Sequence, residues 1–149
     1  MSKKIIPEVA GILLILLFGY AAVSKLMVYN SFVAQIGQSP ILEGLSPYLA
    51  WLVPVVELAI CILLIFKWRL TGFYAATVLM VVFTLYIAAI LFISPTVPCS
   101  CGGILNQLGW KSHLVFNIVF TGIAWLGLFY EKRLKGGDGD IHNQYKYEV

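Results

Sequence analysis

The sequence predicts an all-α polytopic membrane protein, an antiparallel bundle of four transmembrane helices. Apolar residues make up 60% of the 149-residue chain, charged residues make up only 11%, and the mean hydropathy is +0.90. Soluble domains carry about 25% charged residues, because their surface must bind water. A net charge of +3 is also small for a nucleic-acid-binding surface. We therefore expect a lipid bilayer as the surroundings and no nucleic acid as a partner.

Four apolar stretches are each long enough to cross a bilayer as a helix. They cover about residues 5–27, 49–66, 70–93 and 114–130. The hydrocarbon core needs about 20 residues, and a helix satisfies its own backbone hydrogen bonds there. Ser94-Pro95 ends the third stretch, because proline cannot continue a helical hydrogen-bond ladder. We expect one transmembrane domain over residues 1–130 and a polar, loosely ordered cytoplasmic tail over residues 131–149.

The basic residues indicate how the bundle is oriented. Eight of the ten lie before the first stretch, between the second and third, or after the fourth: Lys3, Lys4, Lys67, Arg69, Lys132, Arg133, Lys135 and Lys146. Only Lys25 and Lys111 belong to the other two connections. Because Lys and Arg gather in cytoplasmic loops, both termini are expected in the cytoplasm. The connections around residues 28–48 and 94–113 are then expected to face outward.

The second outer connection holds the candidate chemistry, the sequence Pro98-Cys99-Ser100-Cys101-Gly102-Gly103. Two cysteines one residue apart can close a small disulfide ring, and strain in so small a ring makes the bond easier to reduce. Such a ring closes almost no loop, so it suits electron exchange better than stabilisation. The alternatives are an inert local disulfide, unpaired cysteines without a role, and a metal site. Cys99, Cys101 and His113 supply three ligands where structural zinc takes four, so we expect no metal.

Residues just after the cysteines are candidates for supporting roles. Trp110, His113 and Asn117 are spaced by three and four and share one helix face. His113 can act as a base or hydrogen-bond partner for a thiolate, and the charge of Lys111 can favour that thiolate. Alternatively, His113 is a histidine at the level of the lipid headgroups without a partner. Asn117 is expected to make an interhelical hydrogen bond rather than to act in catalysis.

Two charged residues lie within the predicted spans. Lys25 is near the outer end of the first span, and Glu57 is about 12 Å along the second. Charges at such depth are costly unless they are paired, and the two spans run antiparallel, so we predict a Lys25–Glu57 pair. The pair can fix the packing of the two helices. Alternatively, it can serve as a proton path or as a polar site for a ligand such as a quinone head group. Cys61, the third cysteine, is expected to be a small buried side chain.

Several of these motifs resemble a known family of membrane proteins. Residues 18–26 (FGYAAVSKL) resemble the first-helix signature of the DoxX-like proteins, and residues 53–58 (VPVVEL) resemble their second-helix Pro-x-x-Glu element. Residues 99–103 (CSCGG), followed by residues 108–110 (LGW) and Asn117, are similar to the MauE branch, which is named for methylamine utilisation. The resemblance covers all four predicted spans.

The resemblance implies a bacterial four-helix bundle of the inner membrane, linked to thiol–disulfide chemistry and to thioredoxin-like periplasmic proteins. It implies that Cys99 and Cys101 are the redox pair, and that Lys25 and Glu57 are an intramembrane polar pair. The chain lacks the second outer cysteine pair of the established disulfide-generating membrane proteins. Its pair must therefore exchange directly with a partner on one side, and with a quinone or another partner on the other. The alternative function is a non-catalytic small subunit of a larger membrane complex.

Overall fold

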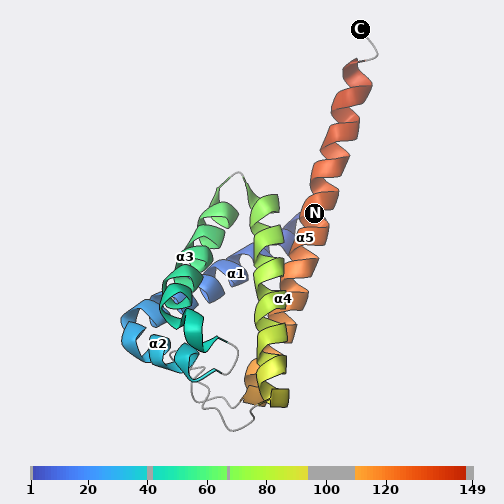
Figure 1. Ribbon diagram of the computed structural model, residues 1–149. Coiled ribbons are helices and arrows are strands. Elements are labelled where there is room, and N and C mark those ends of the chain that lie inside the picture. The colour runs from blue at the N-terminus through green and yellow to red at the C-terminus, as the bar shows by residue number, and fades with distance from the viewer. Residues whose placement is uncertain (1, 40–41, 67, 94–109, 147–149) are drawn as a thin grey trace.

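The protein is an all-α bundle, as the sequence predicts (Figure 1). The computed structural model describes residues 2–39, 42–66, 68–93 and 110–146. Its elements are α1 (Ser2–Met27), α2 (Tyr29–Gly37), a short 3-10 helix η1 (Glu43–Leu45), α3 (Ser46–Ile65), α4 (Arg69–Ile93) and α5 (Trp110–Lys146). No β-strand occurs in these ranges.

Four of the helices are long and apolar enough to cross a membrane. The candidate spans are Lys4–Met27, Ser46–Ile65, Arg69–Ile93 and Lys111–Gly136. At 1.5 Å per residue, even the shortest, with 20 residues, matches a hydrocarbon core of about 30 Å. Large apolar side chains are exposed along all four helices, such as Leu16, Ile62, Val78 and Ile118. A multi-pass membrane protein explains this surface, because lipid covers it.

The four long helices pack in a closed ring. α1 contacts α3 and α5, and α4 contacts the same two helices from the other side. The pairs α1–α3 and α4–α5 are antiparallel. In the first pair, Lys25 of α1 contacts Glu57 of α3. Further back along α1, Ile15 contacts Cys61, which lies further forward along α3. The main core inside the ring includes the buried side chains of Leu14, Phe18, Ile60, Phe73 and Met80.

An ion pair between Arg69 and Glu8 joins α4 to α1, at the end of the ring opposite the contact between Lys25 and Glu57. Arg69 begins α4, and its guanidinium donates hydrogen bonds to the Glu8 carboxylate and to the Pro7 carbonyl oxygen of α1. Glu8 lies in the second turn of α1, which begins at Ser2. The pair therefore holds the beginning of α1 beside the turn between α3 and α4.

A helix, α2, occupies part of the connection around residues 28–48, for which no helix was predicted. α2 follows α1 almost directly and packs against α3 at the end of the bundle opposite the α3–α4 turn (Figure 1). Phe32 and Ile36, one helical turn apart, are buried against Ala50 of α3 in a small separate core. The helix forms because this apolar face finds a partner surface, although a nine-residue helix is marginal alone.

The last helix continues beyond the predicted span, where we expected a loosely ordered tail. α5 has 37 residues and projects past the other helices (Figure 1). Residues 131–135 (EKRLK) are all strong helix formers. The Arg133 guanidinium also lies 4.4 Å from the ring centre of Phe129, one turn earlier. Local propensity therefore favours the helix as far as about residue 135, and it does not explain the continuation through residues 136–140 (GGDGD).

Gly127 allows the closest contact between α4 and α5. A Cβ at position 127 would lie 2.3 Å from Cε1 of Phe73, a fully buried side chain. Gly127→Ala should therefore lower the free energy of unfolding in detergent micelles by about 1–3 kcal/mol, because the ring has to move within a packed core. Gly122→Ala on the same helix is the matched control, since a Cβ there meets no atom within 4 Å. Equal stability of the two variants would contradict this packing.

Candidate functional site

The cysteine pair predicted as the redox centre, Cys99 and Cys101, lies outside the described residues. The structure does show where the chain enters and leaves that segment. α4 ends at Ile93 and α5 begins at Trp110, both at the end of the bundle where α2 lies (Figure 1). The segment carrying both cysteines therefore starts and finishes at the α2 end, which we call the outer end after the predicted orientation.

The predicted supporting residues lie in the first turns of α5 at this outer end. Lys111 is exposed, whereas His113 and Asn117 are buried, with 6% and 4% of their surfaces exposed. Nδ2 of Asn117 donates a hydrogen bond to the His113 carbonyl oxygen at 3.0 Å. His113 is thus part of the packed interior and makes a further interaction, so its interpretation as an unpartnered headgroup-level histidine is wrong.

Threonines, rather than Asn117 itself, make the interhelical hydrogen bond shown here. Thr121 Oγ1 lies 3.2 Å from Thr84 Oγ1 of α4, and each hydroxyl also lies 2.7 Å from a carbonyl oxygen one turn earlier, Asn117 for Thr121 and Met80 for Thr84. Each hydroxyl has one hydrogen, so one threonine donates across to the other, and the threonine that accepts keeps its hydrogen for its own helix. These contacts form a polar line along the α4–α5 interface, which was not predicted. The spacing of four residues from His113 through Asn117 to Thr121 could have indicated it.

The structure brings Lys25 and Glu57 together as a buried ion pair between α1 and α3. Nζ of Lys25 lies 2.6 Å from Oε1 of Glu57, and the side chains are only 9% and 1% exposed. The other carboxylate oxygen, Oε2, is buried and accepts no hydrogen bond from the described residues. One turn further along α3, Cys61 is buried and its Sγ contacts the Ile15 carbonyl oxygen at 3.6 Å.

Aromatic rings enclose the ammonium group of Lys25. Nζ lies 5.9 Å from the ring centre of Phe32 on α2 and 5.8 Å from that of Phe83 on α4. Ring faces attract a cation, so they partly compensate for its removal from water. Neither aromatic residue was predicted to belong to a site. Four helices, α1 to α4, therefore meet at this pair.

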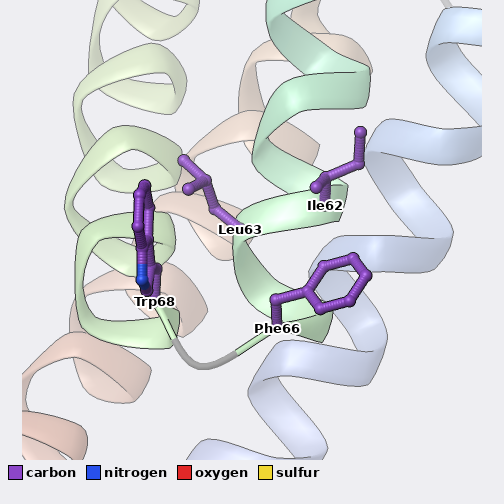
Figure 2. A pocket seen from close by; sticks show the side chains of 4 residues that line it. All are labelled: Ile62, Leu63, Phe66 and Trp68. Carbon is purple, nitrogen blue, oxygen red and sulfur yellow. The ribbon is translucent and has the colours of Figure 1, made fainter.

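The apolar hollow shown in Figure 2 lies elsewhere, beside the turn between α3 and α4. Its volume is about 430 Å³, and it is lined by Ile62, Leu63, Phe66 and Trp68. The lining is apolar and includes neither member of the ion pair. It offers no polar contact for the head group of a quinone, so we derive no step through such a cofactor. Within the described ranges, no three His, Cys, Asp or Glu side chains cluster as metal ligands.

The fold and the buried pair define a class of protein, a small four-span membrane bundle with a charged pair inside it. Residues 3–130 match the family described as methylamine utilisation protein MauE, and the chain belongs to this family. No curated protein and no solved structure matches the chain.

The buried pair predicts a specific pattern of stabilities. Lys25→Met or Glu57→Leu alone leaves one buried charge without its partner and should lower the free energy of unfolding by about 3–5 kcal/mol. The double variant removes both charges and should recover most of that loss. Chemical unfolding in detergent micelles measures all four proteins. A double variant as unstable as the sum of the single variants would show that the two charges do not interact.

Proposed function

We propose that the protein is a thiol–disulfide redox protein of the bacterial inner membrane. It exchanges electrons with a thioredoxin-like partner in the periplasm through Cys99 and Cys101. The observation that carries this proposal is the sequence Cys-Ser-Cys-Gly-Gly in a MauE-family chain, between two spans that end and begin at the outer end of the bundle. The resemblance of the first two spans to DoxX-like proteins supports the same redox association.

The partner and the cysteine pair are the only reactants that this exchange of thiols and disulfides needs. A thiolate of the partner attacks one sulfur of the Cys99–Cys101 disulfide, which forms a mixed disulfide and releases the other cysteine as a thiolate. The second thiol of the partner then attacks the mixed disulfide, so the partner gains a disulfide and the pair becomes a dithiol. Two electrons pass from the partner to the pair, and the protons lost by the partner thiols end on the pair. The reverse sequence of steps reduces the partner instead.

The described residues near this segment support such chemistry. Lys111 is exposed in the first turn of α5, where its charge favours a thiolate nearby. His113, two residues after Lys111, is buried. We therefore assign it a positioning role, in which it anchors the start of α5. The partly buried contact between Thr84 and Thr121 joins α4 to α5, the two helices on either side of the segment.

The second candidate function is a non-catalytic subunit of a larger membrane complex. The observation that favours it is the continuation of α5 as a helix to Lys146, ten residues past the candidate span. In this case the cysteines only shape the outer connection. Purification in a mild detergent separates the two functions, because a subunit comes with stoichiometric companions and a free-standing redox protein does not.

Trapping of mixed disulfides tests the redox proposal. In cells carrying Cys99→Ser or Cys101→Ser, one variant should hold a thioredoxin-like protein in a mixed disulfide, because the second thiol that resolves it is absent. Non-reducing gels and mass spectrometry detect this species. Cys61→Ser is the control and should trap nothing, since it keeps both Cys99 and Cys101, so the second thiol resolves any mixed disulfide. A wild-type pair that is always oxidised, together with no trapped species in either variant, would refute the redox function.

Site-directed labelling tests the proposed orientation. In a variant without the three native cysteines, Ser31→Cys on α2 should react with a membrane-impermeant maleimide applied outside the inner membrane. Lys135→Cys on α5 should react only after that membrane is permeabilised. Both positions are exposed, so reactivity reports the side of the membrane. The opposite labelling pattern would place the cysteine segment in the cytoplasm.

A further inference from the structure

Only one of the two carboxylate oxygens of Glu57 accepts a hydrogen bond from the described residues. Oε1 accepts a hydrogen bond from Lys25, whereas Oε2 is buried, accepts none, and belongs to a side chain that is 1% exposed. A buried carboxylate oxygen that has lost its water hydrogen bonds needs a donor in exchange. Oε2 therefore points to a ligand that carries a hydrogen-bond donor.

The ammonium group of Lys25 has the complementary capacity to donate further hydrogen bonds. It carries three N–H donors, and its hydrogen bond to Glu57 uses one of them. The rings of Phe32 and Phe83 lie 5.9 and 5.8 Å away, which suits cation–π attraction but is too far for a hydrogen bond. A ligand beside the pair can therefore accept from Nζ while it donates to Oε2.

Charge and space limit what this ligand can be. The ion pair is already neutral, so a charged ligand would leave a net charge in an apolar interior. Four helices and two aromatic rings surround the pair, so the binding group must be small. A hydroxyl is the smallest uncharged group that both donates and accepts.

We infer that Glu57 and Lys25 form a binding site for one uncharged hydroxyl group, which donates to Oε2 and accepts from Nζ. Water and the hydroxyl of a lipid-soluble compound share this chemistry. Internal waters in proteins occupy such positions, where two or more polar groups converge. The site does not depend on the cysteine pair, so it stands or falls separately from the redox proposal.

Infrared spectroscopy of the full chain in lipid nanodiscs tests the site. The wild type should show the O–H stretch of a hydroxyl bound to a carboxylate, and Lys25→Arg should lose it. The planar guanidinium of arginine donates to both carboxylate oxygens at once, which removes the need for the ligand. Cys61→Ala is the matched control and should keep the band, because it changes the neighbouring turn of α3 and leaves the pair intact.

The source of the hydroxyl follows from two further measurements. A band that shifts in heavy-oxygen water identifies water. A band that does not shift, together with a stoichiometric hydroxyl compound in the solvent extract, identifies a lipid-soluble ligand. Should Lys25→Arg fail to fold, Glu57→Gln serves instead, and the band should move to higher frequency because the amide nitrogen accepts no hydrogen bond. Absence of the band from the wild type, or its persistence unchanged in the folded variant, would overturn the proposal.

Discussion

The buried ion pair between Lys25 and Glu57 is the constraint on which the outer half of the bundle depends. Apolar packing alone can accept another register of two helices, but a buried charge is stable only opposite its partner. The 2.6 Å contact therefore disfavours any register of α1 and α3 that separates Lys25 from Glu57. The Phe32 ring beside Lys25 then places α2 over the same point. At the other end, the contact between Arg69 and Glu8 joins α1 to α4.

This rigidity bears directly on the proposed redox chemistry. Thiol–disulfide exchange depends on which sulfur is attacked and on access to it, so the positions of the helices on either side of the cysteines matter for the proposed exchange. Within α5, contacts link His113, Asn117 and Thr121, and Thr121 contacts Thr84 of α4. In the proposed function, the bundle supports the short connection at its outer end, where the exchange takes place.

The fold class was predictable because apolar runs of about 20 residues have few structural solutions in a bilayer. The Lys25–Glu57 contact was also visible in the sequence, as two opposite charges in adjacent antiparallel spans. α2 was not, because its nine residues are helical only where Phe32 and Ile36 meet Ala50, a tertiary contact. The continuation of α5 was not predicted either. The polar composition of residues 131–149 indicates a loosely ordered tail, although residues 131–135 individually favour a helix.

Charge reversal tests whether the Lys25–Glu57 pair fixes the packing of α1 against α3, because it keeps both charges and exchanges their places. We expect Lys25→Glu and Glu57→Lys alone to give little folded protein, since each puts like charges together inside the membrane. The doubly reversed protein should regain a cooperative unfolding transition in detergent micelles. Single reversals that fold as well as the wild type would contradict the claim that this pair fixes the packing of α1 against α3.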